Sequence, residues 1–190
     1  IFLIFFSMLL GWPIPLVPVQ ILWVNLITDA FPALALGMEH GEPHIMDMPP
    51  RDTDEPILNR LMQSGILIQG IFISLATLIA FYFGWKHDGG VEMGRTLALS
   101  TLITAELIRA FSSRSERYSL FSIGIFTNKF MVGAILLLFS LLLIVLYNPF
   151  LRQIFEVTGL SLTHWGIVIG LGSLPFLAAE VSKAVIRYRH

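Results

Sequence analysis

Long apolar runs separated by short polar breaks constrain this 190-residue chain more than any other feature of its sequence. The hydrocarbon core of a bilayer is about 30 Å thick, and a helix needs about 20 mostly apolar residues to cross it. Runs of that kind recur here, and 55% of the residues are hydrophobic against 13% charged. This composition is too apolar for a water-soluble domain of this length. We therefore predict an all-α, multi-pass membrane protein whose solvent is the lipid bilayer.

Six apolar runs define the predicted helical bundle, one truncated and five long enough to span the membrane. The first run, residues 1–11, is too short to cross and stops at Trp12-Pro13-Ile14-Pro15, where two prolines end any helix. It lacks a basic leading region, so it does not read as a signal peptide, and we expect it to be half a helix from a longer protein. The full spans are predicted at about residues 19–38, 61–85, 96–111, 130–151 and 162–186.

Charge and cysteine content exclude several classes of function. The 12 basic and 13 acidic residues leave a net charge of −1, which gives no reason to expect a nucleic-acid partner. The chain contains no cysteine, which excludes disulfides and thiolate metal sites.

The distribution of basic residues between the spans predicts the orientation of the bundle. Lys and Arg are retained on the cytoplasmic side of membrane proteins. If the loop from Glu39 to Arg60 is cytoplasmic, nine basic residues fall on that side and three on the other. The nine are Arg51, Arg60, Arg109, Arg114, Arg117, Lys129, Lys183, Arg187 and Arg189, and the three are Lys86, Arg95 and Arg152. We therefore expect the C-terminus to be cytoplasmic.

Three acidic side chains lie within the predicted spans, and Glu180 stands near the end of the last one. The other two, Asp29 and Glu106, require an explanation, because a charge in mid-membrane costs several kcal/mol unless it faces protein or water. Asp29 stands with Asn25 and Thr28 at i+4, i and i+3, which places carboxylate, amide and hydroxyl oxygens on one helix face. Hard cations such as calcium are bound by clusters of such oxygens. Pro32 leaves a carbonyl near Thr28 without its usual helical donor, as in the broken helices of ion transporters.

Glu106 in the third full span, residues 96–111, is a candidate for a second carboxylate ligand from another helix. The sequence leaves a structural alternative open for both groups. Asn25, Thr28 and Asp29 would then form a polar patch that joins helices, since Asn and Thr hydrogen-bond across membrane interfaces. Glu106 would then form a helix-packing hydrogen bond or be a protonated acid.

Two segments resemble a known family. The stretch Val17–Asp29, reading VPVQILWVNLITD, is similar to the fifth-to-sixth transmembrane segment of type II P-type cation-transporting ATPases, particularly the sarcoplasmic-reticulum-like calcium pumps. Ile45–Arg51, reading IMDMPPR, resembles the cytoplasmic signature that follows that helix. The resemblance implies that residues 1–190 form the C-terminal transmembrane cation-transport domain, from a truncated helix five through helix ten.

The resemblance also implies which residues bind the ion. Asn25, Thr28 and Asp29 match the family's sixth-helix ligands, and Glu106 matches the eighth-helix Glu of the calcium pumps. The family's fourth- and fifth-helix ligands, its phosphorylated Asp and its nucleotide domain, which uses ATP and magnesium, have no counterpart in this sequence. We expect those parts, in the same protein, to be partners of this chain, which alone should not hydrolyse ATP.

The leading hypothesis is therefore primary active export of a cation, with calcium preferred, across a bacterial plasma membrane. Two other hypotheses remain. An ion-coupled secondary transporter or channel would also place acids in broken helices. A structural membrane scaffold would make no contact with ions.

Overall fold

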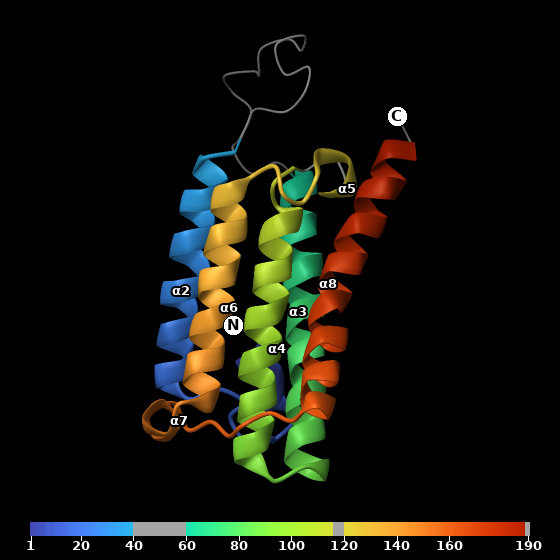
Figure 1. Ribbon diagram of the computed structural model, residues 1–190. Coiled ribbons are helices and arrows are strands. Elements are labelled where there is room, and N and C mark those ends of the chain that lie inside the picture. The colour runs from blue at the N-terminus through green and yellow to red at the C-terminus, as the bar shows by residue number, and fades with distance from the viewer. Residues whose placement is uncertain (40–59, 116–119, 189–190) are drawn as a thin grey trace.

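The computed structural model describes residues 1–39, 60–115 and 120–188, and this part of the chain contains helices and no strands. The long helices run side by side as an up-and-down bundle (Figure 1). The elements are α1 (Phe2–Leu9), α2 (Pro18–Gly37), α3 (Arg60–His87), α4 (Val91–Ser112), α5 (Leu120–Ile123), α6 (Lys129–Tyr147), α7 (Pro149–Phe155) and α8 (Leu162–Tyr188). The loop Ile45–Arg51, which resembles the family signature, lies outside the described residues.

Every predicted apolar run contains a helix, which confirms the all-α prediction. Four helical segments in the described ranges are long and apolar enough to cross a membrane. They are Pro18–Gly37, Gly65–His87, Lys129–Tyr147 and Leu162–Glu180. The predicted count of five full spans and one truncated span is not confirmed, because α4 is not among the four. Its 22 residues include two Glu and two Arg, which lower its hydropathy.

The predicted span 130–151 is wrong at its end. Helix α6 stops at Tyr147, and the chain turns at Asn148 into the short α7. The Asn148 side chain accepts hydrogen bonds from the main-chain N–H groups of Phe150 and Leu151, at 3.0 and 3.2 Å. Pro149 occupies the first turn of α7, where its missing N–H costs nothing. An N-cap followed by proline therefore starts a new helix where the apolar pattern alone would continue the old one.

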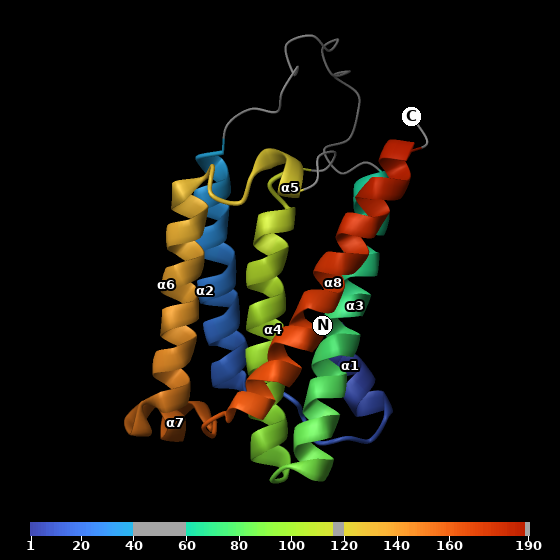
Figure 2. The same cartoon turned by 45° about the vertical axis from the view of Figure 1, so that its right-hand side comes forward.

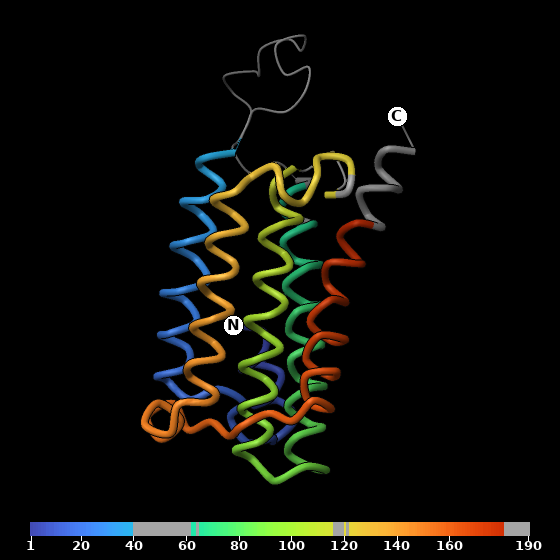
Figure 3. The backbone as a smooth tube through the Cα atoms, viewed as in Figure 1, coloured from blue at the N-terminus to red at the C-terminus, as the bar shows by residue number. Residues whose placement is uncertain are grey.

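Helix α4 lies at the centre of the bundle. It contacts α3, α8, α2 and α6, and α6 and α8 lie on opposite sides of it (Figures 2 and 3). Its buried side chains include small and hydroxylated ones, such as Ala98, Ser100, Thr101 and Thr104. Small residues let helix backbones approach closely in membranes. The least apolar of the long helices is therefore the one that the others surround.

A buried glutamine holds the beginning of α2. The Gln20 side chain is fully buried, and its Oε1 accepts a hydrogen bond from the main-chain N–H of Val17 at 3.1 Å. Its Nε2 donates to the carbonyl of Phe155 at the end of α7, at 2.7 Å. The first turn of α2 is thus fixed to a segment more than 130 residues further along the chain.

A buried ion pair holds the other end of α2. Arg114, counted above with the cytoplasmic basic residues, has a fully buried side chain that forms a two-pronged pair with Glu39. Its Nε and Nη2 each donate to a different carboxylate oxygen at 2.8 Å. Asn128 donates to Glu39 at 2.7 Å and to the carbonyl of Ala35 at 2.9 Å. These contacts join the ends of α2 and α4 to the segment that precedes α6.

Close backbone contact between α3 and α4 generates a stability prediction. A Cβ added at Gly84 would lie 2.8 Å from the main-chain nitrogen of Gly94, so the two helices would have to separate. We expect Gly84→Ala to lower the free energy of unfolding by about 1–3 kcal/mol. Gly133→Ala is the matched control, because a Cβ there meets nothing within 4 Å. It should leave stability unchanged or raise it by up to about 1 kcal/mol. Thermal unfolding in detergent compares the two variants, and equal melting temperatures would contradict the close contact.

Candidate cation-binding site

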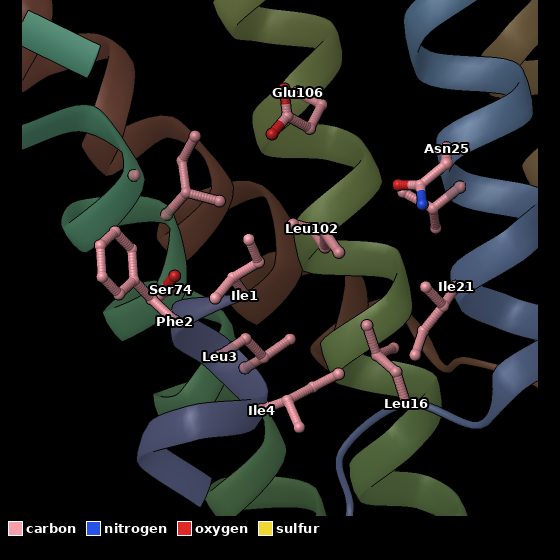
Figure 4. A pocket seen from close by; sticks show the side chains of 13 residues that line it. Ile1, Phe2, Leu3, Ile4, Leu16, Ile21, Asn25, Ser74, Leu102 and Glu106 are labelled. Carbon is pink, nitrogen blue, oxygen red and sulfur yellow. The ribbon is translucent and has the colours of Figure 1, made fainter. Parts of the chain in front are cut away.

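A pocket of about 240 Å³ lies between α1, α2, α3 and α4. Asn25 from α2, Glu106 from α4 and Ser74 from α3 line it with their polar side chains (Figure 4). The other lining groups are mainly apolar and include Leu3 and Leu102. Two of the four predicted ligand residues, from helices distant in sequence, therefore line one pocket.

The position of Asn25 follows from the way α2 packs. Val24 and Ile27 are buried, whereas Asn25 is exposed on the neighbouring part of the helix surface. Thr28, three residues on, is half-buried, and its hydroxyl donates to the carbonyl of Val24 at 2.9 Å. A hydroxyl that donates its proton still has lone pairs with which to accept or to bind a cation. Thr28 can therefore donate its own proton and still offer an oxygen to a cation, although it is not among the residues that line the pocket.

Asp29 is exposed and is not among the residues that line the pocket. Within residues 1–39, 60–115 and 120–188 it has no hydrogen-bond or ion-pair partner. It stands four residues after Asn25, so its carboxylate continues the Asn25 face of α2 by one helical turn. The structure thus leaves this carboxylate exposed and without a partner among the described residues.

Glu106 has a charge partner within its own helix. Its Oε2 accepts from Nε of Arg109 at 2.8 Å and lies 2.7 Å from Nη2 of the same guanidinium. The two side chains are 22% and 41% exposed, respectively. Because both contacts fall on Oε2, the guanidinium orients the carboxylate, and Oε1 makes no hydrogen bond with a residue that the structure describes.

The donor set limits what this site can bind. Among the described residues, no group of three or more His, Cys, Asp or Glu is placed to hold a metal ion. A cation here would rely on amide, hydroxyl and carbonyl oxygens as well as carboxylates, which is the ligand mixture that calcium accepts. The carbonyl of Thr28 is one such oxygen, because Pro32 cannot donate to it.

Some features of the site were missed at the sequence level. The pairing of Glu106 with Arg109 was detectable from their i, i+3 spacing, which places them as neighbours on a helix. Nothing in the sequence marked Ser74 as a residue of the site, because a single serine in an apolar run is common. The burial of Arg114 could not be read from its charge, since positive-inside topology accounts for a basic residue at that helix end.

Comparison with known proteins bears on this site. The family described as "Cation transporting ATPase, C-terminus" matches residues 13–185. The chain belongs to this family. The matched range contains all four predicted ligand residues, Asn25, Thr28, Asp29 and Glu106.

Individual relatives agree with the family match. The chain is 40% identical over 181 residues to a "Calcium-transporting ATPase" of Bacillus subtilis, a match that covers 94% of this chain and 20% of the relative. It is 36% identical over 196 residues to "Calcium-transporting ATPase 1" of Bacillus cereus, covering 95% and 22%. A "Calcium-transporting ATPase 1" of Lactococcus lactis is 35% identical over 186 residues, covering 96% and 20%. The chain thus spans about a fifth of the length of these ATPases.

The Arg109–Glu106 pair is partly exposed and the Arg114–Glu39 pair is buried, which predicts unequal contributions to the stability of this region. Removing Arg109 breaks a partly exposed pair, so Arg109→Gln should lower the free energy of unfolding by less than about 1 kcal/mol. Arg114→Gln leaves Glu39 without its buried guanidinium partner and should cost about 3–5 kcal/mol. Thermal unfolding of the purified variants measures the difference. Similar losses for the two would contradict the assigned burial.

Proposed function

We propose that residues 1–190 are the C-terminal transmembrane cation-transport domain of an ATP-driven P-type pump that exports calcium. The observation that carries the proposal is the pocket shared by Asn25 of α2 and Glu106 of α4. Membership in the cation-transporting ATPase family and the names of the relatives support it. Oxygen ligands contributed by two helices are what a membrane protein needs to replace the water around a hard cation.

In this proposal Asn25, Thr28, Asp29 and Glu106 hold the ion. The amide of Asn25 and Oε1 of Glu106 face it from α2 and α4, and Thr28 contributes its hydroxyl. The exposed Asp29 supplies a carboxylate that Arg109 does not neutralise, since the guanidinium engages Glu106. A divalent cation is thus attracted mainly to the α2 side of the pocket.

The rest of the pump completes the site and drives the cycle. Further transmembrane helices of the same protein would cover the open face of α2 that carries Asn25 and Asp29 and add ligands to it. Cytoplasmic domains outside this sequence would bind ATP and magnesium and accept the phosphoryl group. This chain therefore contributes part of the ion site, and by itself it does not hydrolyse ATP.

The proposal assigns α1, α2, α3, α4, α6 and α8 to helices five through ten of the pump. Helix α4 then crosses the membrane although it is less apolar than its neighbours, because α3, α8, α2 and α6 pack around it. The end of the bundle with Arg109, Arg114 and Lys129 faces the cytoplasm under the positive-inside rule, together with the C-terminus. The lipid bilayer around the bundle is the plasma membrane of a bacterium.

The decisive experiment measures cation-dependent phosphoenzyme formation by the full-length protein from ATP across calcium, manganese, sodium and potassium. A calcium pump should accumulate phosphoenzyme with calcium and not with the monovalent ions. A secondary transporter or channel forms no phosphoenzyme with any of them, and that result would reject the pump.

Asp29→Asn tests the site against the scaffold hypothesis. Removal of the free carboxylate should raise the calcium concentration for half-maximal phosphorylation by ten-fold or more, roughly 1.4 kcal/mol of binding free energy. Glu156→Gln is the matched control, because it neutralises an exposed carboxylate that pairs with Arg95 away from the pocket. Unchanged calcium dependence in Asp29→Asn would indicate a scaffold without ion contact.

A further inference from the structure

We infer that Arg114 is a positioning residue that sets the cation affinity of the pump by holding the C-terminal end of α2 against α4 and the segment before α6. The inference rests on the proposed function, since it concerns the helix that carries three of the four proposed ligands. Arg114 itself does not line the pocket.

All the donors of the Arg114 guanidinium are engaged. Besides the two bonds to Glu39, Nη1 donates to the carbonyls of Gly124 and Ile125 at 2.8 and 3.3 Å. Nη2 also donates to the hydroxyl of Thr127 at 2.6 Å. A guanidinium presents five N–H donors in a rigid fork, so this arrangement fixes the direction as well as the charge of the contact. Arg114 thus connects three separate stretches of chain.

Asn128 extends the same connection. Its amide nitrogen bridges Glu39 and the carbonyl of Ala35, while its Oδ1 accepts from the main-chain N–H of Met131 at 2.9 Å. One side chain therefore satisfies a carbonyl near the end of α2 and caps the start of α6. The end of α2 cannot shift without breaking bonds to Arg114 and Asn128 together.

The burial of the pair argues against a role at the lipid surface. The Arg114 side chain is 0% exposed and that of Glu39 is 16% exposed. Desolvating two charges offsets much of their attraction, so a buried pair is weak evidence of stabilisation as such. What the pair does provide is a unique geometry, because every donor has one acceptor. We therefore infer that the Arg114–Glu39 pair acts mainly by fixing the position of the end of α2 and less by stabilising the fold.

The C-terminal end of α2 is connected to the candidate ligands by α2 itself. The last turn of α2 includes Ala35, whose carbonyl accepts from Asn128; Ala35 lies six residues beyond Asp29, about 9 Å along the axis at 1.5 Å per residue. Pro32 lies between them and interrupts the hydrogen-bond ladder, which lets the two parts of a helix tilt relative to each other. Gln20 fixes the opposite end of α2. The tilt of the Asn25–Asp29 face toward the Glu106 pocket therefore depends on how the last turn is held.

The test uses the full-length pump and the double variant Glu39→Gln/Arg114→Gln. Neutralising both partners removes the two charges of the buried pair together, so the variant is expected to fold, while the fork geometry is lost. We expect the calcium concentration for half-maximal phosphorylation to rise about ten-fold, within the usual range of coupling between sites. The maximal phosphoenzyme per milligram, which reports folded protein, should stay within about two-fold of the wild type. Glu156→Gln, which neutralises an exposed carboxylate that pairs with Arg95 away from the pocket, should change neither value.

Arg114→Lys separates charge from geometry. It keeps the positive charge and loses the fork, so it should show a raised calcium requirement at normal phosphoenzyme yield. A double variant with wild-type calcium dependence would overturn the inference and leave the pair with a structural role only. Loss of phosphoenzyme in proportion to folded protein, at unchanged calcium dependence, would overturn it as well. A wild-type protein that forms no calcium-dependent phosphoenzyme would instead reject the proposed function, and the inference with it.

Discussion

The interaction on which the bundle depends is the enclosure of α4 by its neighbours. A helix that carries Glu106 and Arg109 cannot face lipid around its whole circumference, because charges in hydrocarbon cost several kcal/mol. Packing α3, α8, α2 and α6 around it turns its hydroxylated and small side chains inward. The same packing determines which polar groups meet at the pocket. The fold and the candidate site are thus two consequences of one constraint.

Helix α2 illustrates how a membrane helix can be firmly placed and still present open ligands. Its two ends are held by buried polar contacts, Gln20 to Phe155 and Glu39 to Arg114. Between them, Asn25 and Asp29 are exposed, and the helix ladder is interrupted at Pro32. Fixed ends define where the candidate ligands lie, and the middle of the helix leaves Asn25 and Asp29 exposed. Preorganisation of this kind reduces the cost of assembling an ion site.

Local patterns predicted the helices and much of the candidate ligand set. They did not predict the features that depend on contacts between residues distant in sequence. The apolar runs predicted the helices, and the spacing of Asn25, Thr28 and Asp29 predicted their shared face. The end of α6 was misplaced because Asn148 and Pro149 start a new helix within an apolar stretch. Arg114 was grouped with surface basic residues because its partner Glu39 lies 75 residues away. Periodicity carries no information about such pairs.

The sequence by itself determined that this chain is helical and membrane-embedded, and that oxygen-bearing side chains share one face of the helix predicted at residues 19–38. These properties follow from composition and from the 3.6-residue repeat, which are local. Tertiary structure decided that Asn25 and Glu106 line one pocket, that Arg109 engages the Glu106 carboxylate, and that Arg114 is buried. The physical reason is that burial and charge pairing depend on which helices become neighbours, and distant segments set that arrangement together.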